Sequence, residues 1–191
     1  GSAANLAALL EFLGVTQAVL VGRSQGGFLS LRCALIHPEV VRALVLIDTQ
    51  AGLEDEEASQ QLGALFNTWI EHGLSDDMAT MAEHVVIGQG WPGAAAWRQD
   101  WRKITPHNLA HSVAALVQRD DISPRLSEIH VPTLVIHGFD DIAIPTEKSR
   151  AMAEALPKAH WIGIANAGHA SKLMQPTAVN AAIEEFLAIL Q

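Results

Sequence analysis

Short apolar runs alternate along the chain with stretches in which apolar residues recur at helical spacing. Unbroken apolar runs predict strands at 18–21, 43–47, 133–136 and 161–164. Because these runs have no alternating polar positions, they are typical of strands buried on both faces of a parallel sheet. Helical spacing of apolar residues predicts helices at 6–13, 28–35, 146–156 and 179–190.

The order of these elements predicts the fold class. Strand and helix alternate up to residue 47 and again from residue 133, as in strand–helix–strand units of a parallel sheet. The residues between contain no convincing strand and hold four of the five tryptophans. We therefore expect an α/β fold, a mostly parallel sheet with helices on both faces, in which core parts at 1–51 and 126–191 flank an inserted helical cap at 52–125.

Composition and charge exclude several classes of protein. Hydrophobic residues make up 49% of the 191 residues and charged residues 17%, which excludes a disordered chain. The single cysteine, Cys33, rules out a disulfide framework and a cysteine-based zinc cluster within the chain. The net charge of −9, without any basic run, argues against nucleic acid as a partner. Since neither a long apolar run nor a signal-peptide pattern is present, we expect a cytoplasmic protein without a membrane span.

The strongest chemical signal is Gly-Arg-Ser-Gln-Gly-Gly at 22–27, between a predicted strand and a predicted helix. This is the G-x-S-x-G pattern of a nucleophile elbow, in which a serine occupies a sharp, strained turn. Such a turn needs small residues two before and two after Ser24, and Gly22 and Gly26 meet that need. The main-chain N–H of Gln25, at the start of the helix, is the expected donor to an oxyanion. A simple glycine turn with an incidental serine is the alternative.

A nucleophilic serine requires a base, and the base requires an acid that orients it. His169 follows the last predicted strand, and Asp141 follows the strand at 133–136. Open parallel sheets place their sites at the carboxyl ends of strands, so both residues are expected at the edge that carries Ser24. The chain order Ser24, Asp141, His169 is that of a known class of serine hydrolases.

Two other assignments compete for the acidic residue Asp48, which ends the strand at 43–47. It is a second candidate for the acid that orients His169. It also lies about 20 residues beyond a glycine-rich turn, a spacing found in dinucleotide-binding folds, although the full G-x-G-x-x-G pattern is absent. Among the histidines, His107 and His111 could share a helix face as metal ligands, but Asn108 stands where a zinc protease has glutamate. His137 either lines the site or is a structural histidine.

With these motifs the chain resembles the α/β-hydrolase superfamily, and within it the small cap-bearing esterases and enol-lactonases. The resemblance implies Ser24 as nucleophile, His169 as base, Asp141 as acid and no metal or organic cofactor. Asp141 is preferred to Asp140 because the family pattern is G-x-x-D followed shortly by proline, here Gly138 to Asp141 and then Pro145. The implied reaction is hydrolysis of a small carboxylic ester or lactone through an acyl-serine.

The chain departs from the family pattern in two places. Arg23 stands where the family commonly has histidine. The family's early strands, and the loop that supplies a second oxyanion donor, are expected to be absent. We therefore expect the strand at 18–21 to be an unguarded edge, through which Val19 and Val21 promote self-association or binding of a complementary polypeptide. The alternative to an enzyme is a catalytically silent fragment or binding module.

Overall fold

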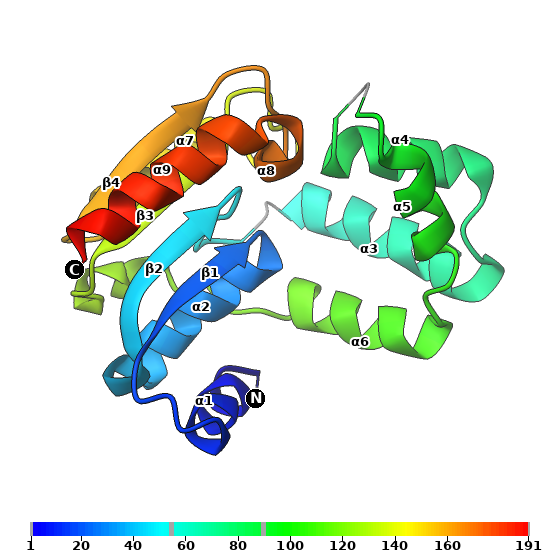
Figure 1. Cartoon of the computed structure of the whole chain (residues 1–191). Coiled ribbons are helices and arrows are strands. Elements are labelled where there is room, and N and C mark those ends of the chain that lie inside the picture. Colours follow the sequence, from blue (N-terminus) through cyan, green and yellow to red (C-terminus); the bar gives the residue numbers. More distant parts are fainter. Residues whose placement is uncertain (1, 54–55, 89–90, 191) are drawn as a thin grey trace.

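The computed structural model describes residues 2–53, 56–88 and 91–190 and contains a parallel sheet (Figure 1). Its strands lie side by side in chain order: β1 (Ala18–Arg23), β2 (Val41–Ile47), β3 (Thr133–Gly138) and β4 (Ala159–Ile164). All three pairings are parallel, so the carboxyl ends of the strands meet at one edge. The four predicted strands are therefore confirmed. Arg23 pairs with Ile47, and Ile47 with Ile136, which brings the residues that follow these strands close together.

Helices cover both faces of the sheet, as the apolar runs predict. One face packs against α1 (Ser2–Phe12), α2 (Gln25–Ile36), α7 (Thr146–Ala155) and the 3-10 helix η2 (Ser123–Glu128). The other packs against α9 (Pro176–Ile189), which follows the short helix α8 (Ser171–Met174). Alternate residues of β2 face opposite sides of the sheet. Leu44 and Leu46 belong to the hydrophobic cluster on the α2 side, and Val45 and Ile47 belong to the cluster on the α9 side.

Between β2 and β3 the described residues form helices and no strand. Besides η2, these are α3 (Glu56–His72), α4 (Asp76–Val86), α5 (Ala94–Trp101) and α6 (Pro106–Val117), which lie together beyond the carboxyl edge of the sheet (Figure 1). Ser75 and Thr105 cap α4 and α6 by accepting hydrogen bonds from main-chain N–H groups. Residues 54–55 and 89–90 of this segment lie outside the described residues.

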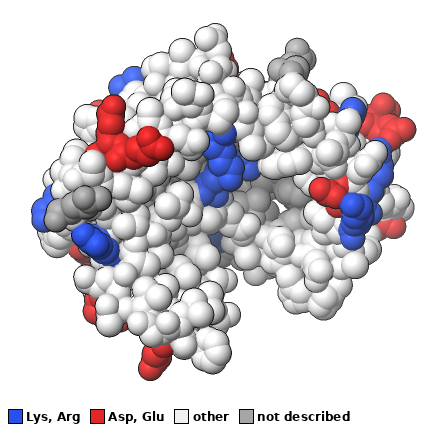
Figure 2. Space-filling model, viewed as in Figure 1, with Lys and Arg blue, Asp and Glu red and all other residues white. Residues whose placement is uncertain are grey.

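The molecular surface is hollowed between the sheet and these helices, with cationic side chains at the margin of the hollow (Figure 2). Three tryptophans of this region pack on one another, since the Trp97 ring meets the rings of Trp91 and Trp101 edge to face, and the fourth, Trp69, stacks on Phe66. None of the helices in the described ranges has both the length and the apolar character that a bilayer crossing requires.

Two exposed apolar features lie at the β1 end of the sheet. Val21 is 58% exposed, which agrees with the expected edge position of β1, since β1 pairs only with β2 within the described sheet. Leu9 and Leu13, which belong to the predicted apolar helix face, are 51% and 60% exposed, so the expectation that this whole face is buried was wrong. Helix α9 packs on β3 and β4, so it leaves this end of the sheet uncovered. Helix α1 ends at Phe12, one residue before the predicted end, and Gly14 follows with a φ of +68°.

Candidate active site

Ser24 lies in a sharp turn between β1 and α2. Its φ of +50° belongs to the left-handed region that side chains other than glycine rarely adopt, and its N–H donates to the Ile47 oxygen at 3.0 Å. A Cβ atom on Gly22 would lie 2.4 Å from the oxygen of Gly26, so position 22 requires glycine. Gly26 itself faces open space, so the expectation that its small size is required there was wrong. The second tight position is Gly27, where a Cβ would lie 2.5 Å from the Thr49 side chain.

The structure brings Ser24, His169 and Asp141 into one hydrogen-bonded chain. The Ser24 Oγ lies 3.0 Å from His169 Nε2, and His169 Nδ1 lies 2.9 Å from Asp141 Oδ2. A carboxylate only accepts, so Nδ1 carries the imidazole proton and Nε2 is left bare. The Ser24 hydroxyl therefore donates to Nε2. This arrangement can take a proton from the serine when its oxygen attacks an electrophile.

Asp141 is held by the loop that follows β3. Its Oδ1 accepts hydrogen bonds from the N–H groups of Ala143 and Ile144, at 2.8 and 2.9 Å. The neighbouring His137 ring is fully buried, with Nε2 2.9 Å from the Ile144 oxygen and 3.3 Å from Asp141 Oδ2. Because a carbonyl oxygen only accepts, Nε2 of His137 carries the proton. His137 thus supports the loop from within and has no exposed surface with which to line the site.

Asp48 is buried beside the hydrogen-bonded chain but is not bonded to His169. Its Oδ1 accepts from the N–H of Gly138 at 3.1 Å, and its Oδ2 accepts from both the N–H and the hydroxyl of Ser171 at 2.9 Å. Burial raises the pKa of this carboxyl, while the donors from Ser171 and Gly138 oppose the rise. Asp48 therefore joins the end of β3 to the segment after β4, and Asp141 occupies the position against His169 Nδ1. No local motif in the sequence indicates the hydrogen bonds between Asp48 and Ser171.

Asp48, His137 and Asp141 also offer atoms within 4.8 Å of one another, a spacing that could suit a metal ion. Their oxygens, however, already accept hydrogen bonds from main-chain and side-chain donors, and His137 Nε2 is protonated. We therefore interpret the group as a hydrogen-bond network. His107 and His111 are exposed neighbours on α6, with ring centroids 4.5 Å apart, and no third ligand joins them within the described ranges.

Two residues beside Ser24 contact the helical segment. The Gln25 side chain donates to the Ser112 oxygen on α6 at 3.3 Å, while its main-chain N–H opens α2. Arg23 donates from Nε to the main-chain oxygen of His169 and from Nη2 to that of Val86, both at 2.8 Å. In the sequence, Arg23 stood out only as a departure from a family pattern. The signal that points to its role is a lone cation between Gly22 and the candidate nucleophile.

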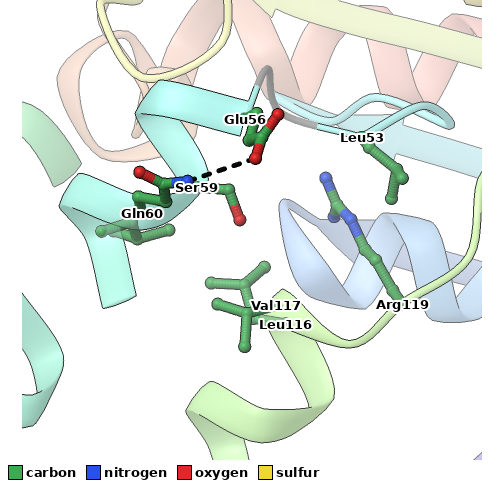
Figure 3. A pocket seen from close by; sticks show the side chains of 8 residues that line it. Leu53, Glu56, Ser59, Gln60, Leu116, Val117 and Arg119 are labelled. Carbon is green, nitrogen blue, oxygen red and sulfur yellow. Dashed lines mark hydrogen bonds between the residues drawn. The ribbon is translucent and has the colours of Figure 1, made fainter. Parts of the chain in front are cut away.

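A separate pocket of about 450 Å³ opens between α3 and α6 (Figure 3). Leucine and valine side chains from both helices form its apolar walls, and Arg119 lies at one side. The Arg119 guanidinium is engaged there, since it lies 4.8 Å above the Phe28 ring and donates to the Gly52 oxygen. None of Ser24, His169 and Asp141 lines this pocket.

Residues 2–175 match the family described as the alpha/beta hydrolase fold. The chain belongs to this family. Among curated relatives of this alpha/beta hydrolase, the putative carbamate hydrolase RutD of Pseudomonas syringae is 30% identical, over 97% of this chain and 73% of that protein.

Solved structures agree with the family assignment. An esterase from Thermogutta terrifontis superposes with a TM-score of 0.88 at 27% identity, covering 98% of this chain and 71% of that one. The putative non-heme bromoperoxidase BpoC of Mycobacterium tuberculosis has a TM-score of 0.85 at 28% identity, covering 99% and 73%. The predicted fold class is confirmed, and the relatives of this alpha/beta hydrolase support hydrolase activity. The family also excludes the dinucleotide-binding alternative for the turn at 22–27.

Proposed function

We propose that this alpha/beta hydrolase cleaves a small carboxylic ester or lactone through an acyl-serine intermediate. The observation that carries the proposal is the hydrogen-bonded chain from Ser24 through His169 to Asp141, at 3.0 and 2.9 Å. The tautomer inferred for His169 leaves Nε2 free to act as base, as a serine nucleophile requires. The residues are those expected from the sequence, and no cofactor is needed for this chemistry.

In the first half of the reaction, Ser24 Oγ attacks the carbonyl carbon while its proton passes to His169 Nε2. Asp141 stabilises the imidazolium through Nδ1. The main-chain N–H of Gln25, at the N-terminus of α2, donates to the oxyanion of the tetrahedral intermediate. The carbon–oxygen bond to the alcohol then breaks, the alcohol takes the proton from His169, and the acyl group stays on Ser24.

In the second half, water attacks the acyl-serine and His169 Nε2 takes a proton from it. Collapse of the second tetrahedral intermediate breaks the bond to Ser24 Oγ, which regains its proton from His169. The acid leaves. For a lactone both halves act on one molecule, so the product is a single hydroxy acid.

A second candidate substrate class is the carbamates. It is favoured by the 30% identity to the putative carbamate hydrolase RutD over 97% of this chain. A carbamate differs from an ester by a nitrogen on the carbonyl carbon, so the same residues would form a carbamoyl-serine. Rates on an ester and a carbamate that share one leaving group would separate the two candidates.

We further propose that residues 52–125 act as a cap over the site, between core parts at 1–51 and 126–191. Support comes from the two contacts that link residues beside Ser24 to the helical segment, Gln25 to Ser112 and Arg23 to Val86. A cap of this kind would exclude water from the acyl-serine and shape the space for a small apolar substrate.

Our proposal about partners concerns the exposed edge of the sheet. Val21, at 58% exposure, lies on the outermost strand, and Leu9 of α1 and Leu13 just beyond it are also exposed. An apolar edge strand without a charged or proline guard is prone to pairing. We therefore propose that the chain self-associates or binds a complementary polypeptide through this edge. A cytoplasmic location stays a prediction.

Reaction with a fluorophosphonate tests the proposed nucleophile. Ser24 Oγ would attack phosphorus, fluoride would leave, and the mass of the intact protein would rise by one phosphonyl group. Ser24→Ala should abolish labelling and ester hydrolysis without unfolding the protein. Ser30→Ala, which removes a buried hydroxyl two turns along α2, is the matched control and should still be labelled. An unlabelled, folded wild-type protein would favour the silent binding module instead.

A further inference from the structure

We propose that Arg23 is a positioning residue that holds the main chain of His169 and couples its position to that of the end of α4. The proposal rests on the proposed function for the role of His169 as base. Arg23 ends β1, one residue before Ser24, and its guanidinium reaches two segments distant in sequence. Nε and Nη2 both donate to the main-chain oxygen of His169, and Nη2 also donates to that of Val86. One planar group thus joins the strand that carries the nucleophile, the loop that carries the base and the helical segment.

The end of α4 is packed against the His169 loop independently of Arg23. Gly88, with a φ of +103°, lies so close to Met174 that a Cβ would approach its sulfur to 2.9 Å. A Cβ on Gly168 would lie 3.5 Å from the Ile87 oxygen, and the Gly168 N–H donates to the Met174 sulfur at 3.3 Å. The two segments therefore have little room to move separately.

The electrostatic setting explains why an arginine suits this position. Val86 is the last residue of α4, where unpaired carbonyl oxygens and the helix dipole favour a cation. Burial lowers the pKa of the Arg23 guanidinium, and the charges of Asp48 and Asp141 oppose this effect. Arginine keeps its proton under such burial and has five donors in a fixed plane. Lysine would supply the charge, but its compact ammonium cannot reproduce that planar fork.

The consequence is that a displacement of the α4 end is transmitted to the base. Arg23 holds the main chain of His169 itself, so a shift there moves Nε2 relative to Ser24 Oγ. A misplacement of about 1 Å between reacting groups can cost about 10²-fold in rate. Through Arg23, the reactivity of Ser24 would thus depend on the position of the helical segment relative to the sheet.

The first experiment compares second-order rates of fluorophosphonate labelling. Arg23→Met should label Ser24 about 10²-fold more slowly than wild type, and Arg23→Lys should recover part of that loss. Arg32→Lys, an arginine on α2 that pairs with Asp120, is the matched control and should label normally.

A double-mutant cycle tests the link to α4. Gly88→Ala places a side chain at a φ of +103°, which strains the main chain beyond α4, and crowds Met174, so it should displace the end of α4. If Arg23 transmits this displacement, Gly88→Ala should slow labelling in wild type but have a smaller effect in the Arg23→Met background. Equal effects in both backgrounds, or normal rates in Arg23→Met, would overturn the proposal.

Hydrogen exchange supplies a readout that does not depend on activity. In Arg23→Met, amide exchange should quicken together at Ile87, which donates to Glu83, and at Ser171, which donates to Asp48. Leu44, in the central strand β2, should keep its protection. If the wild-type chain is not labelled but both segments respond, the proposed function fails and the link stands. If labelling is normal in wild type and neither segment responds, the link is refuted and the proposed function stands.

Discussion

Asp141→Asn is the substitution whose effect on catalysis the structure defines most closely. Oδ1 of Asp141 accepts two main-chain N–H groups, from Ala143 and Ile144, so an amide nitrogen cannot replace it there. The Asn side chain must therefore turn its NH₂ group toward His169 Nδ1. His169 Nδ1 then has to accept a hydrogen bond from this amide, so the imidazole proton moves to Nε2 and faces Ser24.

An imidazole with its proton on Nε2 cannot take the serine proton. A wrong tautomer in a serine triad costs up to about 10⁴ in kcat, and we expect a loss between about 10² and 10⁴. At 1.36 kcal/mol for each factor of ten, this corresponds to about 3–5.5 kcal/mol of transition-state stabilisation. The variant should stay folded because the amide has the size and shape of the carboxylate.

The measurement is kcat on a chromogenic short-chain aryl ester, with thermal unfolding to check the fold. Asp140→Asn is the matched control, since this exposed neighbour takes part only through its main-chain N–H, and it should retain wild-type kcat. Asp48→Asn should lose less than Asp141→Asn. The opposite ranking, with Asp48 the costlier position, would refute the reasoning and assign the acid to the end of β2.

Three further predictions concern stability and assembly. Gly22→Ala should lower the free energy of unfolding by about 1–3 kcal/mol, because its Cβ would lie 2.4 Å from the Gly26 oxygen. Gly26→Ala should leave the free energy of unfolding nearly unchanged, and denaturant titration of both variants measures the difference. Burial raises the pKa of Asp48, so in this pH range the folded protein binds a proton that the unfolded chain has released. The free energy of unfolding should therefore fall as pH rises from about 3.9 through the raised pKa. Asp48→Asn should lack this contribution to the pH dependence. Sedimentation at micromolar concentration should reveal self-association through the β1 edge, weakened by Val21→Lys; a clean monomer that also binds no complementary polypeptide would count against that edge.

The sequence was sufficient for the parts of the fold that follow from local pattern. Continuous apolar runs identified β2 and β3 because both faces of a central parallel strand are covered. The apolar pattern alone did not set Val21 apart, since an edge strand has the same apolar pattern as a central one; the edge position of β1 was expected instead from the departure from the family pattern. Exposure there depends on how far α9 extends over the sheet, which is a property of the assembled chain.

The site likewise contains residues whose roles follow from local pattern and residues whose roles do not. Ser24 stands in a local turn motif, and Asp141 and His169 follow strands, so their convergence was predictable from the topology of a parallel sheet. The roles of Arg23 and Asp48 were not, because each depends on contacts between segments that are far apart in sequence. Asp48 meets Ser171 across the site, and Arg23 meets Val86 from the helical segment.

The position of the helices α3–α6 between β2 and β3 has a consequence for folding kinetics and for the drift of this segment over evolutionary time. Pairing Ile47 with Ile136 requires closing a connection several times longer than an ordinary single-helix crossover. Loop-closure entropy grows only logarithmically, so two doublings in length add only about 1.2 kcal/mol to the closure. The sheet can therefore tolerate insertions and deletions among these helices at small thermodynamic cost. Variation in this segment is constrained by its few contacts with the residues around Ser24 far more than by the need to bring β2 and β3 together.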